Sequence, residues 1–217
     1  MRKLKSAGSL SDQAYNMLKT AIINNEIKPL EYLVEEQIAE QLGISRTPIR
    51  TALKKLEFEG LVEMETSKHT RVRTISVGEV QEYQVLRESL EPLAAQLACV
   101  SMDSEQLLFL KDLCEQQRQS IEEKDFSHFI SLDTQFHCYL SEFTNNNKLK
   151  EFVSSLCTQL QRYVILTNTI QSSSSEALKE HLQIIEAFER RDPEEAAECM
   201  TNHIKNVSRR FGTTPKK

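Results

Sequence analysis

Long apolar runs are missing from this 217-residue chain, and so is any CxxC pair of cysteines. No apolar stretch approaches the ~20 residues that a helix needs to cross a bilayer. The basic first ten residues lack the apolar core of a secretion signal. Five scattered cysteines are typical of reduced thiols in a protein core. We therefore expect a cytoplasmic protein with no membrane partner.

Charge is distributed unevenly along the chain. Residues 1–75 contain 12 Lys and Arg against 10 Asp and Glu, whereas residues 76–217 contain 15 against 22. The composition, 39% hydrophobic and 27% charged, is typical of a globular protein rather than a disordered one. The asymmetry indicates two domains with different roles. A small basic surface on the first can bind nucleic acid although the net charge is −5.

The first 75 residues show three helical patterns followed by two short strands. Apolar residues recur at helical spacing over residues 10–22, 34–42 and 49–56. Ser45 stands at the N-cap of the third helix, and Gly60 follows its end. Strand patterns cover residues 61–65 and 70–74, around a polar tip. This order predicts a winged helix-turn-helix, with three helices and a β-hairpin wing, over residues 1–75.

From Ser76 onward the pattern is helical, without a comparable strand signal or an internal repeat. Helices are expected over residues 76–100, 103–123, 125–143, 148–169, 176–190 and 193–211, with a serine linker at 172–175. Capping boxes begin the first helix at Ser76 and the last at Asp192. Residues 76–217 are therefore predicted to form an all-α helical bundle, so the fold class is mainly α.

The third helix places basic side chains on its solvent face. Arg46, Arg50 and Lys54 are spaced four apart, opposite the apolar positions. Guanidinium groups near the start of such a helix contact phosphates or guanine in the major groove. The predicted DNA-binding residues are Ser45, Arg46, Thr47, Arg50, Thr51, Lys54 and Lys68, with further positive charge on the wing from His69, Arg71 and Arg73. A solvated charged face is the alternative, and it stays open for Lys54 and the wing.

A resemblance to the GntR family of bacterial transcriptional regulators covers this first domain. It is carried by residues 38–50, IAEQLGISRTPIR, and continues through Ala52, Leu53, Leu56 and residues 59–62. The resemblance implies a homodimer that binds a palindromic double-stranded operator. Asn25 and Leu30 stand where the family commonly has Gly, which we expect to change only the turn geometry. Ser67 and Lys68 replace the usual Gly at the wing tip.

Polar residues face the predicted core of the second domain. Asp133 and His137 lie four apart on an apolar helix face, and His181 and His203 lie among apolar residues of two further helices. A buried carboxylate or imidazole is costly without a partner, and one metal ion would satisfy all four. Three imidazoles and a carboxylate suit Zn²⁺, Ni²⁺ or a similar transition metal. Any one of these histidines, taken singly, is more often a hydrogen-bonded core residue.

Two arginines are candidates for binding an anionic effector. Arg87 lies among small residues, where its guanidinium can face an anion, and an i,i+4 ion pair with Glu91 is the alternative. Arg162 is a weaker candidate, whose mixed helix face favours a surface role. Leu86, Leu90, Leu93 and Leu97 form a stripe that supplies either internal core or a dimer interface.

Residues 76–217 resemble the FCD ligand-binding domain of FadR-like GntR regulators. The matching pieces are residues 87–91, residues 133–137, Glu180-His181 and His203-Ile204. In metal-containing members of that group, Asp and His at these positions hold a divalent metal, and a small organic acid reaches it beside the helix arginine. The resemblance thus implies metal ligands at Asp133, His137, His181 and His203, and an effector contact at Arg87.

Four functions are compatible with these patterns. We expect a regulator, not an enzyme, whose operator affinity changes when a small carboxylate binds at the metal. A direct metal-sensing regulator is one alternative, and a metal-dependent hydrolase is another, although no further general base stands beside the set. A helical interaction protein without a DNA partner is the fourth.

Overall fold

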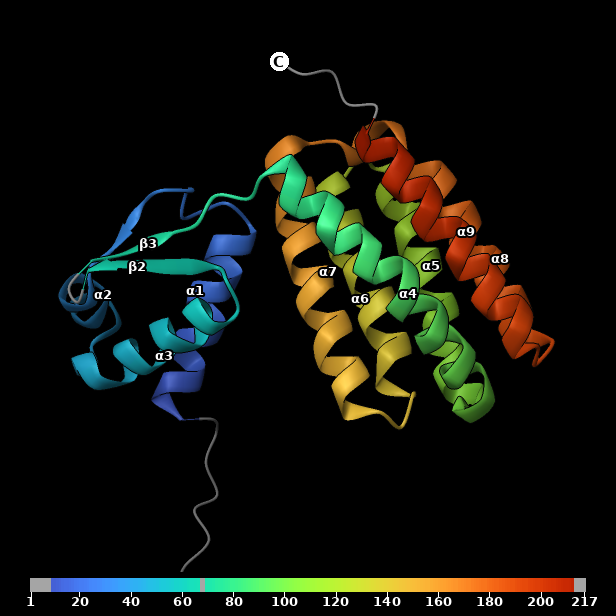
Figure 1. Ribbon diagram of the computed structural model, residues 1–217, viewed down its shortest axis with the longest axis horizontal. Helices are drawn as coiled ribbons and strands as arrows, with labels where there is room; N and C mark the ends of the chain where they lie inside the picture. Colours follow the sequence, from blue (N-terminus) through green and yellow to red (C-terminus); the bar gives the residue numbers. More distant parts are fainter. Residues whose placement is uncertain (1–8, 67–68, 213–217) are drawn as a thin grey trace, which may run out of the picture. The chain divides into compact units, whose positions relative to one another are not determined.

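The computed structural model describes residues 9–66 and 69–212, and it divides between Ile75 and Ser76 into two compact units (Figure 1). The division falls where the charge balance and the helical pattern of the sequence change. The N-terminal unit is a small α/β fold and the C-terminal unit is a helical bundle. Within the described ranges, no helix is both long enough and apolar enough to cross a membrane.

The N-terminal unit is the predicted winged helix-turn-helix. Its elements in chain order are α1 (Leu10–Ile23), β1 (Tyr32–Leu33), α2 (Glu35–Leu42), α3 (Arg46–Phe58), β2 (Val62–Thr66) and β3 (His69–Val72). The antiparallel sheet has the strand order β1-β3-β2, so the predicted hairpin carries a third strand at its edge. Sequence analysis missed β1, because two residues are too few to show a strand periodicity.

The core of this unit forms where the apolar faces of α1 and α3 meet. Ile49, Ala52 and Leu56 of α3 are fully buried, and α1 contributes Ala14 and Ile22. These positions repeat every three or four residues, so each helix turns one apolar stripe inward and its polar face outward. The exposed face of α3 is thereby fixed by the packing of the opposite face.

Two turns on either side of Pro29 use a left-handed backbone. Asn25 has φ 58° and Leu30 has φ 67°, the region that glycine enters most easily. The Leu30 amide donates to the Val72 carbonyl at 2.8 Å, which ties this turn to β3. The chain therefore makes these turns without glycine, and a leucine side chain occupies a strained conformation.

The C-terminal unit is the predicted all-helical bundle. Its elements are α4 (Val77–Ser101), α5 (Ser104–Glu122), α6 (Phe126–Glu142), α7 (Asn147–Thr167), the 3₁₀ turn η1 (Ile170–Ser172), α8 (Ser174–Glu189) and α9 (Pro193–Gly212). α4 packs against α9, α7 and α6, while α5 packs against α6 and α8. The expected serine linker is wrong in detail, because Ser172 ends η1 and α8 already begins at Ser174.

Candidate functional sites

The predicted DNA-reading residues Arg46 and Arg50 of α3 lie beside an acidic partner from α2. Arg50 donates Nε to Glu35 Oε1 at 3.0 Å and Nη2 to Glu35 Oε2 at 2.8 Å. Arg46 Nη2 lies 3.6 Å from the same Oε2. Both arginine side chains remain 57% exposed, as the predicted interface requires. The hydrogen bond from Arg50 lowers the pKa of Glu35, so this carboxylate is charged at neutral pH. Sequence analysis missed Glu35.

The other predicted DNA contacts have different surroundings. Ser45 occupies the predicted N-cap position of α3, and its hydroxyl makes no capping hydrogen bond. Thr47, Thr51 and Lys54 are exposed on α3, and the Thr51 hydroxyl donates to the Thr47 carbonyl at 3.1 Å. Lys68 lies outside the described residues.

The wing is less basic than the sequence predicted. Arg71 Nε lies 2.6 Å from Glu63 Oε1, and its Nη1 lies 2.5 Å from Glu65 Oε1. Two glutamates of β2 therefore balance the charge that was expected to face phosphates. Arg73 donates to the Gly60 carbonyl at 3.4 Å, which directs this side chain toward its own unit.

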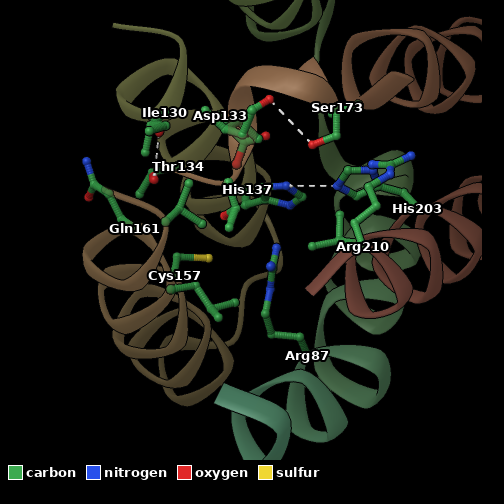
Figure 2. A pocket seen from close by; sticks show the side chains of 16 residues that line it. Arg87, Ile130, Asp133, Thr134, His137, Cys157, Gln161, Ser173, His203 and Arg210 are labelled. Atoms are coloured by element: carbon green, nitrogen blue, oxygen red, sulfur yellow. Dashed lines mark hydrogen bonds between the residues drawn. The ribbon is translucent and has the colours of Figure 1, made fainter. Parts of the chain in front are cut away.

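Three buried imidazoles meet inside the C-terminal unit. His137 of α6, His181 of α8 and His203 of α9 have at most 2% of their surface exposed. One ring nitrogen of each lies within 4.8 Å of those of the other two. His137 Nε2 and His203 Nε2 are 3.3 Å apart, and Figure 2 shows these two rings facing each other across the cavity. His181 and His203 come from the consecutive helices α8 and α9, whereas His137 comes from α6, earlier in the chain.

Asp133 completes the set that the sequence predicted. It lies one turn before His137 on α6, with Oδ1 3.6 Å from His181 Nε2. Its side chain is 27% exposed and lines the cavity, where Figure 2 places it above His137. Among the described residues the cluster of possible metal ligands consists of the three histidines, and Asp133 lies beside it, next to His181.

An acceptor from another helix lies beside Nδ1 of each imidazole, as a hydrogen-bond partner for His203 and His181 and at an ion-pair distance without hydrogen-bond geometry for His137. His137 Nδ1 lies 2.6 Å from Glu91 Oε2, and His203 Nδ1 lies 2.8 Å from Glu180 Oε2. His181 Nδ1 lies 2.9 Å from Gln117 Oε1. A carboxylate accepts only, so a ring beside one carries its proton on Nδ1 and turns a lone pair outward at Nε2. One ring nitrogen from each of the three histidines then faces the same point.

This convergence leaves polar atoms without partners. His181 Nε2 is buried and has no hydrogen-bond partner among the described residues. Burial lowers the pKa of His181 well below its ordinary value and also lowers the pKa of His203. Neutral rings with exposed lone pairs are the state in which imidazole binds a metal. The donor set therefore fits a divalent transition metal. The acceptors beside the Nδ1 atoms are placed as they are around metal-binding histidines, where such partners orient the rings.

Arg87 forms the ion pair that was the alternative to effector binding. Its Nε contacts Glu91 Oε1, and both side chains are buried. Burial alone would raise the pKa of Glu91, but Arg87 and His137 hold it well below its ordinary value. Arg87 also lines the cavity, and Figure 2 shows its guanidinium reaching toward His137. The ion pair and the position beside the cavity therefore coexist.

Arg162 was expected at the surface, and this is wrong. Only 1% of its surface is exposed, because α7 is buried along much of its length. Among the described residues that line the cavity, its neighbour Gln161 is present and Arg162 is absent. The mixed helix face hid this burial from sequence analysis.

Arg210 is a cavity residue that sequence analysis missed. It lies on α9 seven residues after His203, hence two turns along the same helix face. Its guanidinium contacts Glu180 Oε1, while the other oxygen of that carboxylate faces His203. The helical spacing from His203 was the signal that could have found it.

A winged helix-turn-helix followed by this helical unit defines a DNA-binding transcriptional regulator, and comparison with known families agrees. Residues 10–72 match the gntR family of bacterial regulatory proteins, and residues 82–206 match the FCD domain. The chain belongs to the GntR family and carries an FCD domain.

Individual relatives extend over nearly the whole chain. The HTH-type transcriptional regulator YdhC of Bacillus subtilis is 30% identical over 193 residues, which are 88% of this chain and 86% of that protein. The transcriptional repressor RspR of Escherichia coli is 26% identical over 206 residues, which are 95% of this chain and 90% of that protein. The structure of McbR/YncC of E. coli superposes with a TM-score of 0.80 at 23% identity, covering 94% of this chain and 98% of that one, which supports the fold.

Proposed function

We propose that this regulator senses a small organic acid at a divalent transition metal, Zn²⁺ or Ni²⁺, held by Asp133, His137, His181 and His203. The observation that carries the proposal is the convergence of three buried imidazoles, each with Nδ1 beside an acceptor from another helix. On the other side of the rings, His137 Nε2 and His203 Nε2 lie 3.3 Å apart, and His181 Nε2 has no hydrogen-bond partner among the described residues. A cation gives all three lone pairs a partner.

The cavity next to these imidazoles suits a carboxylate with a short apolar part. Arg87 and Arg210 lie on its walls and attract a negative group. Ile130, Leu160 and Val207 supply apolar parts of the lining, beside polar side chains such as Thr134, Gln161 and Ser173. When bound, the metal supplies a positive anchor for a carboxylate oxygen. The residues of the chain orient the acid and select its size.

Operator control requires the acid to favour one arrangement of a dimer over another. The stripe on α4 supports self-association, because Leu86 is 49% and Leu93 is 41% exposed in the single chain. Two copies would present two α3 helices to successive major grooves of a palindromic operator. An acid shifts that equilibrium only by its difference in affinity for the two arrangements. Acid binding would thereby change operator affinity through the arrangement of the two chains in the dimer.

The test uses the full chain and an operator selected from random duplexes. Native mass spectrometry is expected to show a dimer with one metal ion per chain, and a chelator is expected to remove that metal. Operator affinity, titrated with a panel of short organic acids, is expected to change with at least one of them. A metal-free wild-type protein, or constant affinity with every acid that binds, would contradict the proposal. A response to metal alone would favour direct metal sensing.

A further inference from the structure

Two similar chains of contacts connect the cavity with the candidate metal ligands. In the first, Arg87 contacts one oxygen of Glu91, and the other oxygen lies 2.6 Å from His137 Nδ1. In the second, Arg210 contacts one oxygen of Glu180, and the other lies 2.8 Å from His203 Nδ1. Each carboxylate is therefore shared between an arginine that lines the cavity and an imidazole that faces the metal position.

The two carboxylates are built into the structure rather than placed by chance on its surface. The side chain of Glu91 is 2% exposed and that of Glu180 is 14% exposed. Glu180 also accepts from Asn206 Nδ2 at 2.8 Å, which fixes its orientation on α8 against α9. His203 and Arg210 lower the pKa of Glu180 against the effect of burial, so it is charged at neutral pH.

A carboxylate that is shared between two partners interacts less strongly with each of them than it would with one alone. A carboxylate that accepts from Nδ1 makes the imidazole a stronger ligand at Nε2. A guanidinium on the second oxygen draws electron density away from the carboxylate, so the carboxylate strengthens the imidazole less as a ligand. The influence of the guanidinium is large because both of its neighbours lie in a poorly solvated interior. An anion in the cavity competes with the carboxylate for the same guanidinium. When the arginine turns to the anion, the carboxylate interacts more strongly with the ring.

We propose that Glu91 and Glu180 are positioning residues that couple anion binding at Arg87 and Arg210 to metal affinity at His137 and His203. This inference rests on the proposed function, since it requires the metal site to exist. It adds a second route of coupling to the direct bond between acid and metal. Because coupling is reciprocal, the loaded metal also raises the affinity for the anion.

The more exposed chain, Arg210–Glu180–His203, allows a test that does not need the natural acid. Zn²⁺ affinity is measured by competition with a chromophoric chelator for wild type, R210Q, E180Q and the double variant. Replacing Arg210 mimics its withdrawal from Glu180, so R210Q is expected to bind Zn²⁺ about fivefold more tightly. E180Q keeps the size of the side chain and is expected to bind about tenfold more weakly. In the E180Q background, R210Q is expected to have no further effect.

The double variant distinguishes coupling through Glu180 from direct charge repulsion between Arg210 and the metal ion. If loss of a cation near the metal were the whole cause, R210Q would strengthen binding equally in both backgrounds, and this result would overturn the proposal. A weakening by R210Q would also overturn it, because Arg210 would then merely support the site. K205Q removes a charge from an exposed position of the same helix, and its Zn²⁺ affinity is expected to match wild type.

The buried chain provides an independent check. R87Q and E91Q are compared in the same cycle, with circular dichroism to establish that each variant folds, since removal of one buried partner is strongly destabilising. If either fails to fold, the result at Arg210 and Glu180 decides alone. Absence of Zn²⁺ binding by wild type would reject the proposed function itself, whereas binding with additive effects in the cycle would reject only the coupling.

Discussion

The carboxylate of Glu35 offsets positive charge on the exposed face of α3 that is predicted to read DNA. It makes two hydrogen bonds to Arg50 and lies near Arg46, so one carboxylate offsets part of the charge of two guanidinium groups. Phosphates of any sequence attract unpaired cations, and such contacts supply most non-specific affinity. A glutamate at this position is therefore expected to restrain the two arginines from binding DNA of any sequence, and its two hydrogen bonds hold the Arg50 guanidinium in one orientation.

We expect E35Q to bind non-operator DNA several-fold more tightly than wild type, with a steeper dependence on salt. The removed negative charge lies close to the position of the phosphates, and each additional phosphate contact increases the salt slope by about one. Fluorescence anisotropy with a random-sequence duplex at several salt concentrations measures both effects. E57Q, which removes an exposed charge from the far end of α3, serves as the control. Equal affinities for E35Q and E57Q would argue against a restraining role.

At the scale of elements, the turn before β1 has a conformation unfavourable for its residue. Leu30 has φ 67° and its side chain is 51% exposed, so the strain of a left-handed leucine is balanced by little burial. L30G removes the strain and costs some chain entropy, and we expect a net gain of about 0.5 kcal/mol in the free energy of unfolding. Urea denaturation measures this gain. L30A keeps the strained φ and is expected to show no gain, so stabilisation by both variants would contradict the explanation.

Elements were largely predictable because their signals are local. Periodic apolar positions and caps predicted the helices. The capping box at Ser76 is present with both reciprocal hydrogen bonds, and at Asp192 the side chain accepts from the Glu195 amide at 2.9 Å. The burial of His137, His181 and His203 was also predictable, because a polar side chain on an apolar helix face points inward. β1 was missed, since its two residues acquire strand structure only by pairing with β3.

Contacts between elements were the part that the sequence could not give. Glu35 meets Arg50 across 15 residues and Glu180 meets Arg210 across 30, so no helical periodicity connects either pair. Burial of Arg162 likewise depends on the helices packed around α7, which its own helix face does not reveal. The position of Arg210, in contrast, follows from its spacing to His203 once the latter is known to face a cavity.

At the scale of the whole molecule, stability of the helical unit depends on imidazoles that remain neutral. Burial keeps the pKa values of His181 and His203 below the ordinary value of 6.5. The unfolded chain takes up protons below about pH 6.5, whereas these rings in the folded protein resist protonation. Their contribution is therefore fully present above pH 6.5 and is lost as the pH falls toward their folded values.

We expect chelator-treated protein to lose roughly 1.5–3 kcal/mol of unfolding free energy between pH 7.5 and 5.5, because each buried ring contributes about 1.4 kcal/mol per pH unit. The pKa values of Glu91 and Glu180 are lowered, so these carboxylates also lose stabilising effect as the pH falls, but only near and below their unfolded value of 4.5. Their contribution therefore lies outside the range from pH 7.5 to 5.5. Urea denaturation at both pH values measures the loss. H128Q, at an exposed position on α6, should retain it, and H181Q should reduce it. Equal stability of the metal-free wild type at the two pH values would show that the rings accept protons inside the bundle, and it would contradict this expectation.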